Sequence, residues 1–151
     1  MKAALRQGTA IDLNIYTCEP ARFLGKSAFP WDYNHAPLLD GIILHYGVLP
    51  RGFVEPFNTG KVLVHEAGHW MGLYHTFQGG CDGDGDFVSD TPNEATASVA
   101  SCPMGRDTCP SPGLDPTENY MDNSGDMCWT QFTFEQYARM DEHFAIYRSG
   151  K

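Results

Sequence analysis

The sequence predicts an α+β domain, because strand-like segments come first and helical segments follow. Short strand patterns cover residues 12–16, 25–29 and 41–46, a helical pattern runs from about residue 60 to 71, and a second helix begins after Thr133. Between the two helices the chain is rich in Gly, Pro, Asp and Cys and shows little periodicity. This composition indicates irregular but ordered structure.

Length and charge limit the classes of function. A chain of 151 residues is the size of one ordinary domain, so we expect residues 1–151 to form a single domain. The formal net charge is −9, and the ten basic residues are scattered. Nucleic acids and anionic membrane surfaces bind clustered Lys and Arg, so neither is an expected partner. No apolar run has the length of a membrane span.

The three predicted strands rest on different patterns. Asp12–Tyr16 alternates apolar and polar residues, whereas Gly41–Tyr46 is a short apolar run, and both patterns are typical of strands. Gly25–Phe29 is the third predicted strand. Pro30 follows it and suits the edge of a sheet, where a missing backbone N–H is tolerated.

The first predicted helix carries a metal-binding pattern. Thr59 is a suitable N-cap, the helix is expected from about Gly60 to Met71, and Gly72 stands where a left-handed residue would end it. Because residues four apart lie on one helix face, the imidazoles of His65 and His69 can converge on one zinc ion.

Two further residues complete this pattern. A turn at Gly72 lets His75 return toward the ion as a third ligand. Glu66 projects beside the metal, which suits a general base acting on a water molecule. Three protein ligands leave one position open, as in catalytic zinc sites.

The second predicted helix opens with a capping box formed by Thr133 and Gln136. Apolar side chains then recur at helical spacing and are expected to form its buried stripe: Tyr137, Met140, Phe144 and Tyr147.

The irregular segment, residues 76–131, contains four of the five cysteines, and Cys18 stands apart. Two disulfides among these four would indicate an oxidising compartment. The first eight residues are too polar for a signal peptide, so the chain is expected to be a mature or truncated form.

An acidic, glycine-rich loop lies at the start of the same segment. Carboxylates occupy every second position from Asp82 to Asp86, and Ser89, Asp90 and Thr91 follow. Such oxygen ligands suit Ca²⁺, and the alternative is a solvated acidic loop.

The motif His65-Glu66 with His69 and His75 resembles the metzincin signature, and residues 69–77 resemble its pappalysin family. The resemblance covers essentially the whole chain, since further stretches follow the family's order: Asp12–Tyr16, Leu24–Pro30, Gly79–Cys81, Asp86–Pro92, Arg106–Pro110, Asn119–Asp122, Cys128 and Phe132–Thr133.

The resemblance implies a metzincin fold, with a twisted mixed sheet and an active-site helix above a cleft (residues 1–75) and an irregular, disulfide-linked lower part ending in a helix (76–151). It implies a secreted protein with one catalytic Zn²⁺ and a structural Ca²⁺. The implied residue roles are zinc ligation by His65, His69 and His75, general-base catalysis by Glu66, a Met-turn at Met121 beneath the metal, disulfides Cys81–Cys109 and Cys102–Cys128, and calcium ligation by Asp86, Val88 through its carbonyl, Asp90 and Thr91.

Two departures from the family affect the expected activity. Members commonly have Tyr two residues after the Met-turn methionine, where this chain has Asn123. Asn123 can donate a hydrogen bond to the transition state but is shorter, so catalysis is expected either to be weaker or to depend more on the metal. The catalytic domain is also expected to be N-terminally short.

The predicted function is a zinc-dependent endopeptidase that binds a peptide or protein substrate in extended form along Lys26–Phe29. Asp126 would attract a basic side chain just past the scissile bond, or is a solvated surface residue. The alternatives are a non-catalytic zinc- and calcium-binding pseudoprotease and a truncated fragment.

Overall fold

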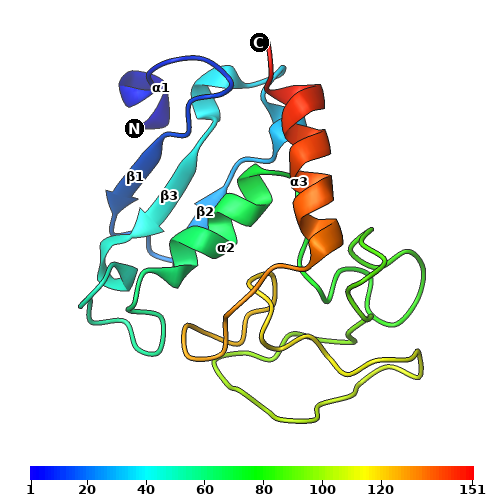
Figure 1. The fold of residues 1–151 in the computed structure, drawn as a ribbon. Coiled ribbons are helices and arrows are strands. Elements are labelled where there is room, and N and C mark those ends of the chain that lie inside the picture. Colours follow the sequence, from blue (N-terminus) through cyan, green and yellow to red (C-terminus); the bar gives the residue numbers. More distant parts are fainter.

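A small mixed sheet, one helix packed on it and a long irregular segment make up the molecule (Figure 1). The computed structural model describes residues 1–151. Its elements are α1 Lys2–Leu5, β1 Ile15–Cys18, β2 Gly25–Ser27, the 3₁₀ turns η1 Pro30–Asp32 and η2 Pro37–Leu39, β3 Ile42–His45, the 3₁₀ turn η3 Tyr46–Val48, α2 Lys61–Trp70 and α3 Phe134–Tyr147. The predicted α+β class is confirmed, and β2 and β3 lie within their predicted ranges but are shorter. The first predicted strand covers residues 12–16, whereas β1 begins three residues later and extends to Cys18.

The sheet has the order β1-β3-β2, with β3 in the centre. β1 runs parallel to β3, pairing Ile15 with Ile42, and β2 runs antiparallel to β3, pairing Gly25 with Leu44. β2 therefore forms one edge of the sheet, as Pro30 indicated, and its outer backbone groups are free to pair with another chain.

The main hydrophobic core lies between the sheet and α2. Alternate β3 residues, Ile42 and Leu44, are fully buried and pack with Val62 and Trp70 of α2. Trp129, from the end of the irregular segment, joins the same core. Burial of side chains of this size contributes about 1.5–3 kcal/mol each, so this contact holds α2 against the sheet.

The C-terminal helix is fastened by a second core and by one buried arginine. Met140 of α3 packs with Leu73 and Met121. Arg148, directly after α3, is fully buried, pairs with Asp40 and donates to the carbonyl of Trp70. Together these contacts hold α3 beside α2 (Figure 1).

Two sequence predictions about the helices are wrong in detail. Thr59 does not cap α2, because its N–H and its hydroxyl both donate to the Asp126 carboxylate. The N-cap is Gly60, in a left-handed conformation with φ 94°. In α3 the capping box of Thr133 is present, but Tyr137 is 54% exposed and is not part of a buried stripe.

The segment between α2 and α3 contains no helix or strand apart from one bridge between Asn119 and Gln131. Its two disulfides join Cys81 to Cys109 and Cys102 to Cys128, as the resemblance implies, and Cys18 is free. A buried ion-pair cluster adds to them, in which Arg106 contacts Glu94 and Asp115. None of the helices is long and apolar enough to cross a lipid bilayer.

Candidate metal centre and cleft

Three histidine rings meet at the end of α2. The Nε2 atom of His69 lies 3.1 Å from the Nε2 atom of His65 and 3.1 Å from that of His75. Two of these rings come from adjacent turns of one helix face, and the third returns from the chain beyond Gly72. The predicted three-histidine cluster is therefore assembled.

The donor set fits a zinc ion. Three imidazole nitrogens at Zn–N distances of roughly 2.0–2.1 Å in tetrahedral arrangement lie about 3.3–3.4 Å apart, close to the separation of 3.1 Å found here. Burial lowers the pKa of all three imidazoles, that of His75 to about 4, so each ring is neutral at pH 7. Neutral imidazole is the form that binds metal.

Backbone carbonyls orient two of the rings. The Nδ1 atom of His65 lies 2.6 Å from the carbonyl oxygen of Tyr120, and that of His69 lies 2.8 Å from the carbonyl oxygen of Leu73. A carbonyl can only accept, so each Nδ1 carries the proton and each Nε2 presents its lone pair to the shared point. Such outer contacts raise ligand basicity and hold the ring in place.

The turn at Gly72 brings His75 back to the cluster. Gly72 has φ 102°, a conformation that residues with a side chain rarely adopt. A Cβ at this position would also clash with the ring of His143 on α3. Both the backbone angle and the close helix contact therefore require glycine here.

Glu66 lies beside the histidines, and its carboxylate packs against the backbone of Gly25 in β2. The residue is 6% exposed, and burial raises the pKa of its carboxyl to about 7. A carboxyl with this pKa both accepts and releases protons near neutral pH. Its position and pKa suit the predicted general base.

Met121 is fully buried beneath the histidine cluster. Its sulfur contacts Gly68 so closely that a Cβ there would clash with it. Because Gly68 lies between the two helical ligands, Met121 supports the turn of α2 that carries them. The Met-turn role that the resemblance implies for Met121 stays a prediction.

A cleft of about 690 Å³ opens in front of the cluster. Its upper rim is β2 with Phe29, and its walls include Tyr74, Asn123 and Trp129. Asn123, predicted to support the transition state, thus lines the cleft with the histidines and Glu66. That role stays a prediction.

The acidic loop is compact. The carboxylate of Asp86 accepts hydrogen bonds from the Val88 N–H and the Thr91 hydroxyl, and the Val88 carbonyl accepts from the same hydroxyl. Asp90 instead accepts from the N–H of Glu135 at the start of α3. Calcium ligation by these residues stays a prediction.

Asp126 is buried and does not line the cleft. One carboxylate oxygen accepts from Thr59, and the other has no hydrogen-bond partner. It is therefore not a solvated surface residue, the alternative considered for it. Its predicted attraction for a basic substrate side chain is not tested by these contacts.

Sequence reasoning missed two aromatic neighbours of the cluster. Trp129 stacks on His65 with ring centroids 5.4 Å apart, and Phe29 meets His69 edge-on at 5.4 Å. Trp129 lies 64 positions beyond its partner, and no local pattern indicates such a contact.

A family model and two similar curated proteins all point to metallopeptidases. Residues 54–145 match the profile of the peptidase M43 family, described as pregnancy-associated plasma protein-A. An extracellular metalloprotease of Pyricularia oryzae is 53% identical over 155 residues, covering 100% of this chain and 54% of the relative. Extracellular metalloprotease 1 of Coccidioides posadasii is 46% identical, covering 100% of this chain and 56% of the relative.

Solved structures agree in fold. Mature mirolysin of Tannerella forsythia, in complex with a cleaved peptide, matches with a TM-score of 0.80 and 32% identity over 90% of this chain and 53% of its own. A structure of mirolysin in complex with a compound matches with a TM-score of 0.79 and 35% identity over 90% of this chain and 53% of its own. The chain spans about half the length of the curated relatives it matches.

Proposed function

Because this chain belongs to the pregnancy-associated plasma protein-A family of metallopeptidases, the pappalysin family of metzincins, we propose that it is a secreted zinc-dependent endopeptidase. One observation carries the proposal. Three neutral imidazole nitrogens converge on a point that a buried carboxylate, Glu66, faces from the side, and both open into a cleft large enough for a peptide.

When bound, zinc supplies a Lewis acid that polarises the scissile carbonyl and activates a water molecule. His65, His69 and His75 hold the ion, and the carbonyls of Tyr120 and Leu73 keep two of these rings in the metal-binding tautomer. Leu73 lies three residues beyond the end of α2 and Tyr120 in the irregular segment, so both parts of the chain orient the histidine rings.

Glu66 moves the proton. Its carboxylate takes a proton from the attacking water and delivers it to the nitrogen of the departing amine. The raised pKa of about 7 matches both steps, since such a group is partly protonated at neutral pH and can both take up and release a proton. Contact with the Gly25 backbone keeps the carboxylate next to the edge of β2.

The substrate binds as an added strand along β2. The free edge of β2 offers backbone N–H and C=O groups to an extended peptide, as in other cases of strand addition. This arrangement brings the peptide backbone past Gly25, and so past Glu66, whatever its side chains are.

Three finer assignments belong to the same proposal. Ca²⁺ binds at Asp86, Val88, Asp90 and Thr91 and stiffens the loop after His75. Asn123 donates to the transition state from the cleft wall. Asp126 attracts a basic substrate side chain through its charge, from behind the wall of the cleft.

Zinc-dependent cleavage of casein and of an Arg-containing quenched peptide tests the function. We expect cleavage by the wild-type chain with one equivalent of zinc and loss of cleavage with EDTA, restored by added zinc. Glu66→Ala should reduce kcat by about 10²–10⁴-fold. The variant should still bind zinc, as measured by calorimetry.

The surface variant Glu142→Ala is the matched control and should leave both readouts unchanged, because Glu142 is exposed and lies outside the cleft. Equal cleavage by wild type and Glu66→Ala would contradict the proposal. Stoichiometric zinc binding without any cleavage would make the chain a metal-binding module instead.

A further inference from the structure

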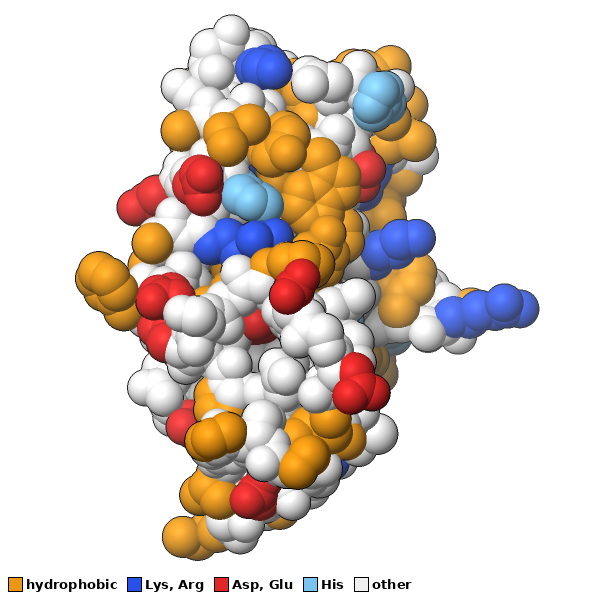
Figure 2. Space-filling view, turned by 90° about the vertical axis from the view of Figure 1, so that its right-hand side faces the viewer, with side chains coloured by type: hydrophobic (Ala, Val, Ile, Leu, Met, Phe, Trp, Pro, Cys, Tyr) orange, Lys and Arg blue, Asp and Glu red, His pale blue; other side chains and the backbone are white.

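A second hollow lies beside the cleft and has no role in the chemistry described above. It has a volume of about 400 Å³ and is lined by Trp31, Tyr74, Phe87, Arg139, His143 and Tyr147, which we call the aromatic trough. Figure 2 shows the face on which α3 lies, where hydrophobic side chains gather next to a histidine and to Lys or Arg side chains.

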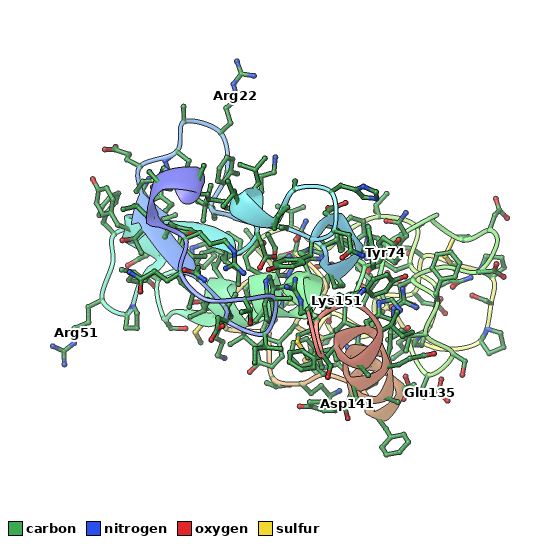
Figure 3. All side chains as sticks on the ribbon, turned by 90° about the horizontal axis from the view of Figure 1, so that it is seen from above. Arg22, Arg51, Tyr74, Glu135, Asp141 and Lys151 are labelled. Atoms are coloured by element: carbon green, nitrogen blue, oxygen red, sulfur yellow. A yellow bond between two sulfur atoms is a disulfide. The ribbon has the colours of Figure 1, made fainter.

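The rings of the trough come from distant parts of the chain. Trp31 of η1 lies 5.5 Å from Tyr74 and 6.2 Å from Tyr147 of α3, measured between ring centroids. Phe87 of the acidic loop lies 5.7 Å from Tyr74. These separations are typical of interacting aromatic pairs. Tyr74 lies between η1 and α3 (Figure 3).

Phe87 is exposed to solvent and has a strained backbone conformation. Its backbone has φ 63°, an outlier for a bulky residue, and its side chain is 57% exposed. An exposed ring kept in an unfavourable conformation is a feature that occurs at ligand sites. Phe87 and Tyr74 contact each other and line the trough, and neither belongs to the hydrophobic core.

The trough is continuous with the cleft. Tyr74 lines both. Phe29 lines the cleft, meets the ring of the zinc ligand His69 at 5.4 Å and stacks on Trp31 at 4.6 Å. A peptide that leaves the cleft along the chain after β2 therefore passes directly over the trough.

The direction of β2 indicates which residue of a bound peptide would face the trough. Glu66 faces Gly25, and Phe29 lies four residues further, about 13 Å in extended chain. Antiparallel pairing, the more stable arrangement, places the N-terminal half of the peptide at the Phe29 end. The trough then faces a substrate residue three to five positions before the scissile bond.

The side chains that line the aromatic trough favour one kind of substrate side chain. The guanidinium of Arg139 lies 5.5 Å from the Tyr74 ring and 5.8 Å from the Phe87 ring, and its Nε donates to the carbonyl of Gly72. Its fixed positive charge repels Lys and Arg side chains, whereas its plane and the surrounding rings stack with an aromatic ring.

We propose that the aromatic trough is a specificity subsite that binds an aromatic substrate side chain three to five residues upstream of the scissile bond. The proposal rests on the proposed endopeptidase function. It adds a second recognition point outside the metal centre and Asp126.

Quenched peptides that differ at one upstream position test the subsite. With the full chain and zinc, a peptide carrying Phe should be cleaved with a kcat/KM about tenfold above its Ala counterpart, and Lys should fall below Ala. The preference should be greatest three to five residues before the scissile bond. Trp31→Ala and Phe87→Ala should each reduce it to about twofold.

Phe134→Ala is the matched control, because Phe134 is 83% exposed and lies outside the trough and the cleft. It should retain the full preference. Equal use of Phe and Ala by the wild type, a preference for Glu, or a maximum downstream of the scissile bond would each overturn the subsite, and none of these depends on a variant folding.

A binding measurement separates this proposal from the proposed function. If no peptide is cleaved, the endopeptidase proposal fails, and fluorescence anisotropy of labelled Phe and Ala peptides decides on the trough. About tenfold tighter binding of the Phe peptide, lost in Trp31→Ala, supports the subsite. Equal or undetectable binding of both peptides overturns it.

Discussion

The half of the molecule that contains the sheet and α2 is stabilised differently from the irregular segment between α2 and α3. In the first, regular hydrogen bonding and an apolar core around Ile42, Leu44 and Trp70 hold the chain, and one buried ion pair joins Asp40 to Arg148 after α3. In the second, disulfides and a buried ion-pair cluster take their place. The candidate metal centre draws on both, since α2 supplies two of its three histidines and the irregular segment supplies the Tyr120 carbonyl and Met121 beside them.

This difference shows that a precise site does not require regular structure on every side. A helix sets the spacing of His65 and His69 through its own backbone geometry. In the irregular segment, the two disulfides and the ion pairs of Arg106 restrict the backbone conformation instead. The two halves should therefore respond differently when their own type of contact is removed.

Removing the buried arginine should have the largest effect. Arg148→Ala leaves Asp40 with less compensation and removes donors from the carbonyls of Trp70 and Ala10. Breaking a buried pair costs about 3–5 kcal/mol. Denaturant unfolding of wild type and variant should show this loss in the free energy of unfolding.

Arg22→Ala provides the control, because Arg22 extends away from the body of the molecule (Figure 3). Its free energy of unfolding should stay within about 0.5 kcal/mol of wild type. If Arg148→Ala were equally mild, the buried pair with Asp40 would not be what holds the end of α3 against the half that contains the sheet.

Removing one disulfide should have the next largest effect, confined to the irregular segment. The Cys102–Cys128 bridge spans 26 residues, for which loop-closure entropy predicts roughly 3 kcal/mol. The double variant Cys102→Ala and Cys128→Ala should unfold at lower denaturant, and limited proteolysis should cut residues 76–131 first. Cys18→Ala, which removes the free cysteine, should change neither result.

The buried ion-pair cluster predicts a smaller, pH-dependent effect. Burial and the neighbouring Asp122 raise the pKa of Glu94 to about 7, since one guanidinium, that of Arg106, serves several carboxyls. Between pH 4.5 and 7 the folded state then binds more protons at Glu94 than the unfolded state. This contribution lowers the free energy of unfolding as pH rises through that range.

Glu94→Gln removes this titration and retains a group that can bond to Thr76. The Tm of the variant relative to wild type should rise by on the order of a few degrees from pH 5 to pH 8. A difference in Tm that is constant over this range would show that Glu94 has an ordinary pKa. Glu142→Gln, at an exposed position, should show no such trend.

Local patterns predicted the helices and the cluster well. The capping box at Thr133, the stop at Gly72 and the His65/His69 pair each involve residues within one or two helical turns, where spacing dictates geometry. Predictions failed where a residue distant in sequence binds the hydrogen-bonding groups that a local rule assigns to the helix end. Thr59 is a good N-cap by local rules, but the carboxylate of Asp126 takes both of its donors.

The sequence by itself determined the three-histidine cluster, the place of Glu66 beside it and the elements that carry them, because helical periodicity and glycine conformation act over a few residues. Only the tertiary structure decided which carbonyls orient the rings, what Met121 supports, and which aromatic side chains form the trough. Several of those contacts join residues more than 40 positions apart, such as Trp31 with Tyr74 and with His143. The packing of the whole chain sets these pairs, and no local repeat encodes them.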